Sequence, residues 1–162
     1  MERNCPCWFI ELLNDWCSKL TSVVRWGNYL SEAFKITSGV RQGTVSSPVL
    51  FAVCVDNLLR TLGKSKLGCY IKSCCFNSIM YADDLILISL SIRDLQSMLN
   101  ICTKEFRNVG LSVNCAKTFC MRVGPKHSVE PNNIVLNSVS IPWVQEFTYL
   151  GITIVSANHF KN

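Results

Sequence analysis

The chain has 162 residues, of which 49% are apolar and 17% charged, and its formal net charge is +5. This length corresponds to one domain with a core of its own, and the apolar content excludes a disordered chain. The charge favours polyanionic partners only weakly, and no apolar run approaches the ~20 residues of a membrane span, so we expect no membrane association.

The N-terminal segment predicts a helix followed by a β-hairpin. Apolar residues recur at helical spacing from Trp8 to Leu20. An apolar stretch over residues 23–26 comes next, then a Gly27-Asn28 turn signal and a second extended stretch over residues 34–37. Two extended stretches around a turn signal are typical of a hairpin.

A loop over residues 38–44 separates this hairpin from a second helix. Ser47 is a suitable N-cap and Pro48 suits the first helical position. The run that follows, residues 49–59, is apolar almost all round and on its own could be a buried strand. Its Ser-Pro start and its length favour a buried helix, in which we expect Cys54 to behave as a small core hydrophobe.

Two short apolar runs in the middle of the chain predict a strand–turn–strand unit. They cover residues 79–82 and 85–90, and they are joined through Asp83 and Asp84. The pattern therefore places two adjacent carboxylates at or beside a tight turn.

A third helix and several short strands complete the chain. Ser91 offers an N-cap, apolar residues recur at helical spacing from Ile92 to Phe106, and Gly110 is placed to end the helix in a left-handed conformation. Short extended pieces follow at residues 111–113, 119–123, 134–136, 139–141 and 147–154. We expect an α+β fold with antiparallel hairpins, as a single domain over residues 1–162.

Ten cysteines allow three interpretations. The first is a secreted disulfide framework, but the N-terminus has no clean apolar signal-peptide region. The second is a zinc site, which is disfavoured because no Cys-x-x-Cys pair exists and His127 and His159 lie far apart in the sequence. We expect the third, reduced thiols in an intracellular protein of the cytoplasm or nucleus.

Asp83 and Asp84 are candidates for a metal site. Adjacent carboxylates repel each other, and a divalent cation removes that cost. Mg²⁺ typically takes one or two carboxylates together with substrate phosphates, and a pair of such ions can serve a nucleotidyl transfer. The Asp-Asp dipeptide alone is more often an ordinary hairpin turn, because Asp is common in turns, so the remaining segments decide the interpretation.

The sequence Tyr81-Ala82-Asp83-Asp84 resembles the catalytic box of reverse transcriptases. Three more segments are similar to successive motifs of the reverse transcriptases of non-LTR (LINE-type) retrotransposons, and they are Ser38–Phe51, Gly110–Thr118 and Phe147–Ile152. Their order and approximate spacing match that family over about residues 22–154. The chain resembles a partial reverse transcriptase domain.

The resemblance implies a fold and an activity. The fold would be a polymerase palm-like antiparallel sheet with packed helices, truncated on the fingers side. The activity would be RNA-directed DNA synthesis, with nucleotidyl transfer to a primer 3′ hydroxyl by a two-metal mechanism. The implied partners are an RNA template, a DNA primer and dNTPs, and the implied cofactor is Mg²⁺, with Mn²⁺ as the alternative.

The resemblance also implies roles for individual residues. Asp83 would be a direct metal ligand and Asp84 its acidic neighbour. Lys117 would neutralise phosphate charge or act as a general acid, and a surface lysine without a role is nearly as frequent. Nucleotide or template contacts would come from Arg41, Gln42, Gly43 and Tyr81. The primer end would be held by Tyr149, Leu150 and Gly151, for which a core strand with a bulge glycine is the alternative.

One segment of the family pattern has no counterpart. The family carries a further metal-binding aspartate on an earlier strand, and nothing between Met1 and Gly39 matches it, since Asp15 lies in an amphipathic helix pattern. At the position of Ser46, the family usually has a larger apolar residue. We therefore expect the chain to begin after that strand and to be inactive alone.

Two other readings of the chain follow. One is a catalytically inactive retrotransposon remnant that retains at most nucleic-acid binding. That binding would use five cations, Arg41, Lys64, Lys66, Lys117 and Arg122. The other is a cysteine-based metal-binding or interaction module, which the cysteine spacing supports poorly.

Overall fold

The computed structural model describes residues 5–39, 42–126, 128–129 and 131–158. The chain divides into two compact units, unit 1 over Met1–Ser47 and unit 2 over Pro48–Asn162, and each is described by itself. No helix of the described residues combines the length and the hydropathy that a bilayer crossing requires.

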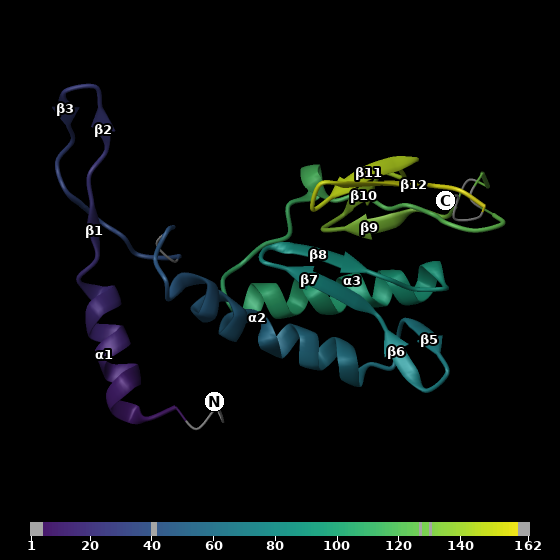
Figure 1. The fold of residues 1–162 in the computed structure, drawn as a ribbon, viewed down its shortest axis with the longest axis horizontal. Coiled ribbons are helices and arrows are strands. Elements are labelled where there is room, and N and C mark those ends of the chain that lie inside the picture. The colour runs from purple at the N-terminus through teal and green to yellow at the C-terminus, as the bar shows by residue number, and fades with distance from the viewer. Residues whose placement is uncertain (1–4, 40–41, 127, 130, 159–162) are drawn as a thin grey trace. The chain divides into compact units, whose positions relative to one another are not determined.

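Unit 1 consists of one helix and a two-stranded arm (Figure 1). The helix α1 covers Cys7–Ser18, close to the predicted range. The arm contains β1 (Thr21–Ser22), β2 (Arg25–Trp26), β3 (Tyr29–Leu30) and β4 (Phe34–Lys35). The turn at Gly27-Asn28 is confirmed, but the chain returns at Tyr29 and not at residue 34, because β2 and β3 pair directly across this two-residue turn.

Local interactions hold unit 1 together. The arm is antiparallel, with β1 paired to β4 and β2 paired to β3. Further backbone hydrogen bonds extend it, from the Ser31 amide to the Val24 carbonyl and from the Ile36 amide to the Leu20 carbonyl, each 2.9 Å long. The described residues of this unit include no buried apolar side chain, so hydrophobic burial contributes little to its stability.

The helix α2 (Ser47–Lys64) begins one residue earlier than predicted, because Ser47, expected as the N-cap, is its first residue. It ends five residues later than predicted, at Lys64 instead of Leu59. The expectation that it is buried all round is wrong. Its buried residues are Val55, Leu58 and Leu62, whereas Val49 is 63% exposed and Cys54 is also exposed. Only the residues at spacings of three and four face the core, so Cys54 is not a core hydrophobe.

The helix α3 (Ile92–Asn108) has the predicted cap and the predicted end. The Ser91 hydroxyl accepts a hydrogen bond of 3.2 Å from the Asp94 amide, and Gly110 has a φ of +73°. Cys102 is buried on this helix, and burial raises the pKa of its thiol to about 12. The thiol therefore stays protonated at neutral pH and packs as an apolar group.

The other elements of unit 2 are a short 3₁₀ helix and eight strands. The 3₁₀ helix is η1 (Cys115–Lys117). The strands are β5 (Cys69–Ile71), β6 (Cys74–Phe76), β7 (Ser78–Tyr81), β8 (Asp84–Leu87), β9 (Ile134–Leu136), β10 (Val139–Ile141), β11 (Glu146–Tyr149) and β12 (Ile152–Val155). They form antiparallel two-stranded sheets, each from consecutive strands. These hairpins and helices confirm the α+β class.

Several strand predictions differ from the structure. The β5–β6 hairpin was not predicted, and the extended pieces expected at residues 111–113 and 119–123 form no named strand. In the second of them Cys120 makes an isolated bridge to Trp143. The strand expected over residues 147–154 is two strands, because the chain turns at Leu150-Gly151.

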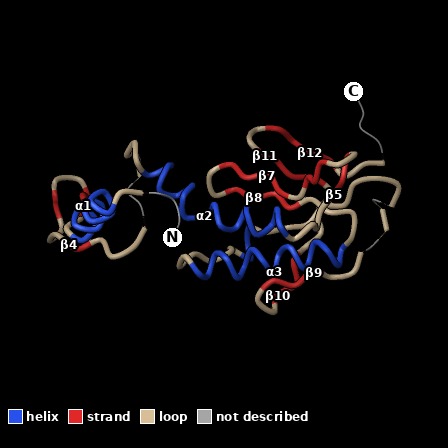
Figure 2. The backbone as a smooth tube through the Cα atoms, turned by 90° about the horizontal axis from the view of Figure 1, so that it is seen from below, coloured by secondary structure: helices blue, strands red, loops and turns tan. Residues whose placement is uncertain are grey.

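Two hydrophobic clusters make the core of unit 2. The first joins α2 to α3 and consists of Leu58, Leu62, Met98 and Cys102. The second joins α3 to the β9–β10 hairpin and consists of Leu99, Ile134, Leu136 and Ile141. Leu87 of β8 packs against both clusters and Leu85 against the first. The two helices therefore support the β7–β8 hairpin, as Figures 1 and 2 show.

Candidate active site

The two candidate metal ligands lie at the turn between β7 and β8. Tyr81 pairs with Asp84, so the loop consists of Ala82 and Asp83 alone. Ala82 has a φ of +50° and Asp83 a negative one. This sign pattern is that of a type II′ turn, which matches the twist of paired strands. Asp83 therefore lies in the turn and Asp84 on the first residue of β8.

Both aspartates are exposed, and their charges have no partner among the described residues. Within the described part of the chain, neither carboxylate accepts a hydrogen bond or forms an ion pair. Adjacent like charges repel, and each requires solvation or a cation. The turn is thus a place where a bound cation lowers the electrostatic energy.

The carboxylate pair suits one divalent cation that also binds a substrate. Mg²⁺ is commonly held by one or two carboxylates together with substrate phosphates, and this turn provides two. Over the described residues, no group of three or more His, Cys, Asp or Glu side chains is placed to hold a metal. The described residues therefore offer a shared carboxylate site and not an all-protein cage. His127 and His159, considered for zinc, lie outside the described residues.

The hairpin that carries the turn is anchored at its other end. The Ile88 amide donates a hydrogen bond of 2.8 Å to the Asn77 carbonyl. The Asn77 side-chain amide donates one of 2.9 Å to the Leu62 carbonyl, near the end of α2. Figures 1 and 2 show the β7–β8 turn at the same end of unit 2 as the start of α2 and the end of α3. The two helices and the hydrogen bonds at this end of the hairpin therefore support the exposed turn that carries the two aspartates.

Lys117 lies on η1, in the segment that follows α3. The Asn114 side chain accepts a hydrogen bond of 3.0 Å from the Ala116 amide, and the Asn114 carbonyl accepts one of 3.2 Å from the Lys117 amide. The Lys117 side chain is exposed. Among the described residues, no ion pair or hydrogen bond links it to the aspartates.

The predicted nucleotide-binding loop belongs to unit 1, whereas the aspartate turn belongs to unit 2. Arg41 lies outside the described residues. Gln42 and Gly43 are exposed, and Gly43 has a φ of +79° with open space where a Cβ would be. A backbone without a side chain there permits close approach by a ligand. Tyr81, the fourth residue of this predicted set, flanks the aspartates and is 63% exposed.

The predicted primer-end residues form the turn of the β11–β12 hairpin. Leu150 and Gly151 have φ values of +50° and +81°, so both central residues are left-handed, as in a type I′ turn. Gly151 is thus a turn residue, and the alternative of a bulge glycine is wrong. The Tyr149 hydroxyl is buried and bonds to no described group. Phe147 packs against Phe119, with 5.1 Å between the ring centroids.

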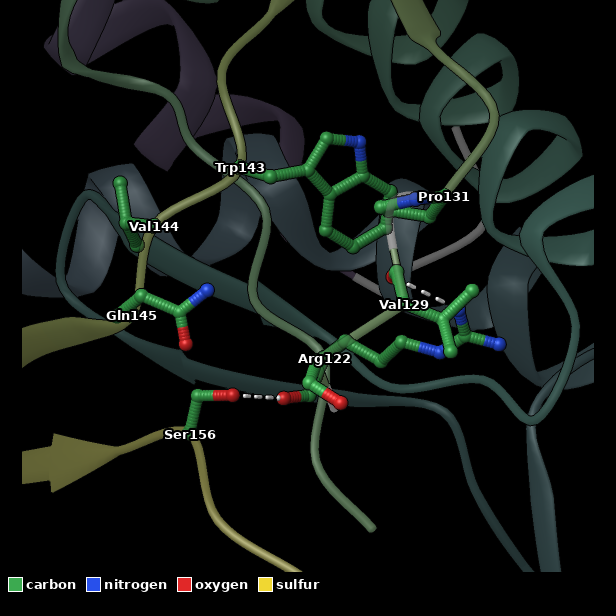
Figure 3. A pocket seen from close by; sticks show the side chains of 8 residues that line it. Arg122, Val129, Pro131, Trp143, Val144, Gln145 and Ser156 are labelled. Atoms are coloured by element: carbon green, nitrogen blue, oxygen red, sulfur yellow. Dashed lines mark hydrogen bonds between the residues drawn. The ribbon is translucent and has the colours of Figure 1, made fainter. Parts of the chain in front are cut away.

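A cavity of about 250 Å³ lies beside this hairpin (Figure 3). Arg122 directs its guanidinium to the Val129 carbonyl, with an Nη1–O distance of 3.3 Å, and its own carbonyl accepts a bond of 2.6 Å from Ser156. Arg122, predicted to bind polyanions, therefore also has a structural partner. Trp143 lines the cavity, and sequence reasoning missed it because no motif or spacing marks that residue.

Comparison with known proteins identifies the family. The model of the reverse transcriptase (RNA-dependent DNA polymerase) family matches residues 3–154. The chain is 32% identical over 139 residues to the retrovirus-related Pol polyprotein from the type-2 retrotransposable element R2DM of Drosophila melanogaster. The chain is also 28% identical over 153 residues to the retrovirus-related Pol polyprotein from the type-1 retrotransposable element R2 of Popillia japonica.

The alignments cover 81% and 87% of the chain, but the chain spans only 13% and 24% of the two polyproteins. The family match covers most of the chain and includes the aspartate turn. The chain therefore belongs to the reverse transcriptase (RNA-dependent DNA polymerase) family, in its non-LTR retrotransposon branch.

Proposed function

We propose that the chain is the palm region of an RNA-directed DNA polymerase, as a single partial reverse transcriptase domain over residues 1–162. The activity is nucleotidyl transfer from dNTPs to the 3′ hydroxyl of a DNA primer on an RNA template. The observation that carries this proposal is the exposed pair Asp83 and Asp84, on a hairpin that two helices support, in a chain of this family. The protein would work inside the cell, in the cytoplasm or nucleus, where these partners occur.

In this proposal the aspartates hold Mg²⁺, or Mn²⁺ in its place, together with the phosphates of the incoming nucleotide. The bound metal would neutralise the phosphate charge and favour the departure of pyrophosphate. Lys117 adds a positive charge or a proton for the leaving group, which requires it to approach the aspartates when substrate binds.

The remaining nominated residues contact the nucleic acid. Tyr81 lies beside the aspartates and contacts the nucleotide or the template. Arg41, Gln42 and Gly43 contact the same partners from unit 1. Tyr149, Leu150 and Gly151 hold the primer end through the exposed turn between β11 and β12. Exposed turn backbone of this kind offers N–H groups to phosphates.

A second candidate function is nucleic-acid binding without catalysis. It is favoured by the carboxylate count, since the described residues bring no third acidic, thiol or imidazole ligand to the turn. A two-metal site with two carboxylates binds its metals weakly. Template–primer binding without extension would then be the whole activity of the chain.

Metal binding tests the aspartate pair directly. We would titrate Mn²⁺ into the chain with template–primer and a dNTP, and follow the electron paramagnetic resonance signal of free Mn²⁺. Asp83→Asn combined with Asp84→Asn is expected to weaken binding on the order of tenfold or more. Glu146→Gln, which removes one exposed charge elsewhere in unit 2, is the matched control and is expected to bind normally. Equal Mn²⁺ binding by all three proteins would overturn the assignment.

Primer extension separates the two functions. The chain would be given an RNA template, a DNA primer, dNTPs and Mg²⁺, alongside Asp83→Asn. Template-dependent extension that the substitution abolishes would show a polymerase. If the folded chain binds template–primer but extends nothing, the second function is the correct one.

A further inference from the structure

The helix α1 carries a row of exposed apolar side chains. Trp8, Leu12 and Trp16 follow one another at intervals of four residues and are 66%, 56% and 45% exposed. Side chains at this spacing form a ridge along a helix, and such ridges pack into the grooves of other helices. We call these three residues the α1 ridge. Phe9 widens it, because the Phe9 and Trp8 rings meet edge to face with 5.8 Å between their centroids.

Unit 1 has no core that includes this ridge. No residue of α1 is buried, and the described part of unit 1 contains no buried apolar side chain. Units of this size that lack a core are usually completed by disulfides, by a metal or by association. Its cysteines are free, and the described residues include no group of three or more His, Cys, Asp or Glu side chains placed to hold a metal. These observations favour association through the α1 ridge.

The charges beside the α1 ridge indicate what kind of partner fits it. Between Cys7 and Ser18 the charged residues are Glu11 and Asp15, and both are acidic. The neighbouring Lys19 forms an ion pair with Asp15, with 2.7 Å between Nζ and Oδ1. Membrane surfaces and nucleic acids are anionic and attract helices that carry cations beside their contact surface. An apolar ridge bordered by carboxylates therefore fits a protein surface.

The α1 ridge is complementary to a second copy of itself. When two α1 helices lie antiparallel about a two-fold axis at Leu12, residues equally far before and after position 12 face each other across the axis. Leu12 then meets Leu12 of the second copy, and Trp8 meets Trp16 of the second copy. The order of large, small and large side chains along the ridge is the same in both directions, so every position of the ridge has an apolar counterpart.

We propose that the chain forms a reversible homodimer through the α1 ridge, with the two α1 helices antiparallel about Leu12. The exposed parts of Trp8, Phe9, Leu12 and Trp16 provide roughly 400 Å² of apolar surface per copy. Two copies bury about 800 Å² in this way, which is the size of weak, transient contacts. We therefore expect a dissociation constant on the order of 10–1,000 μM, so that dilute solutions contain the monomer.

Sedimentation equilibrium over roughly 10–1,000 μM chain tests the proposal directly. A reductant keeps the free thiols from forming disulfides between copies. Leu12→Asp is expected to weaken association at least about tenfold, because it places two carboxylates against each other at the axis. Asn14→Asp is the matched control, since it adds the same charge on the opposite side of α1 and should change association by less than about twofold.

The two tryptophans test the antiparallel arrangement. Trp8→Ala and Trp16→Ala remove the same contact from its two sides, so each should weaken association by a similar factor, about tenfold or more. The two residues are ~12 Å apart along one helix, a separation at which substitutions within a monomer are additive. In the dimer they meet across the axis, so the double variant should lose less than the product of the two factors. A double variant that loses the full product would contradict the antiparallel arrangement.

A charge pair at the axis separates loss of contact from loss of folding. Leu12→Asp and Leu12→Lys should each be monomeric alone and should associate when mixed, because the two opposite charges then meet at position 12. Circular dichroism of each variant checks its helix content. The proposal is wrong if the parent chain stays monomeric over the whole range, if Leu12→Asp associates like the parent, or if the folded charge variants stay monomeric when mixed. The assay contains no metal, nucleotide or nucleic acid, so its outcome is independent of polymerase activity.

Discussion

The backbone conformation of the turn at Ala82 and Asp83 resembles that of the other hairpin turns in this protein. The chemistry of the turn comes from its carboxylate side chains. Six described residues other than glycine have a positive φ, and five of them lie in two-residue hairpin turns. Ala82 at +50° is one, and Leu150 and Asn137 are others. Each such residue costs on the order of 1–2 kcal/mol, which strand pairing offsets. Strain alone therefore does not mark the site, whereas two adjacent carboxylates without a partner in the described part of the chain do.

Gly68 is the residue at which the backbone admits no side chain. Its φ is +129°, and a Cβ there would lie 2.6 Å from the Asn77 Cβ and 2.9 Å from the Phe76 carbonyl oxygen. Gly68→Ala is expected to lower the free energy of unfolding by at least about 1–3 kcal/mol, because both backbone strain and crowding act. Urea denaturation followed by circular dichroism measures this.

Gly63 provides the control for that substitution. It lies within α2, its φ is not positive, and apart from its chain neighbours and the helix's own backbone nothing lies within 4 Å of an added Cβ. Gly63→Ala is expected to raise the free energy of unfolding by up to about 1 kcal/mol, because alanine favours a helix. Equal effects of the two substitutions would contradict the structural account of Gly68.

At the scale of elements, a side chain joins α3 to a strand edge. The Gln96 amide nitrogen donates a hydrogen bond of 2.8 Å to the Val135 carbonyl, and its oxygen accepts one of 2.8 Å from the Val135 amide. The side chain thus takes the place of a neighbouring strand along β9. Unpaired strand edges are sites of unwanted association, and this pair protects one.

Gln96→Ala is expected to remove both hydrogen bonds to Val135. Amide hydrogen exchange at Val135 should accelerate, and the free energy of unfolding should fall by about 1–3 kcal/mol, since each net hydrogen bond contributes ~0.5–1.5 kcal/mol. Asn100→Ala removes only the 2.9 Å bond between the Gln96 amide and Asn100 and is the control. If the Val135 amide hydrogen exchanges at the same rate in both variants, Gln96 does not stabilise the edge of β9.

At the scale of the whole molecule, the core is confined to unit 2. Every buried apolar side chain of the described chain lies at or beyond Val55. Unit 1 is held by the hydrogen bonds of α1 and the arm, and an isolated two-stranded hairpin is only marginally stable. Unit 1 should therefore unfold locally at a lower free energy than unit 2.

Two leucines on helices test this contrast. Leu62 in α2 is fully buried, whereas Leu12 in α1 is 56% exposed. Leu62→Ala is expected to lower the free energy of unfolding of unit 2 by about 2–5 kcal/mol, because it leaves a cavity. Leu12→Ala should change stability by less than about 0.5 kcal/mol. Thermal and urea denaturation of both variants give the comparison, and equal losses would mean that unit 1 has a core of its own.

The sequence by itself determined the features that depend on residues close along the chain. The Ser91 cap and the Gly110 end of α3, the turn at Asp83, and the start of α2 to within one residue are such features. Caps, turns and helical periodicity depend on interactions within a few residues, so they can be read directly. The four motifs around the aspartates also predicted the family that the comparisons confirmed.

Only the tertiary structure decided which apolar surface is buried. The run over residues 49–59 does not specify its inner face, and the packing of Leu58 and Leu62 against α3 selects it and leaves Cys54 exposed. The same holds for Gln96 with Val135, 39 residues apart, and for Cys120 with Trp143. These contacts join residues distant in the chain, and their free energy depends on the complementary surface, which no local pattern encodes.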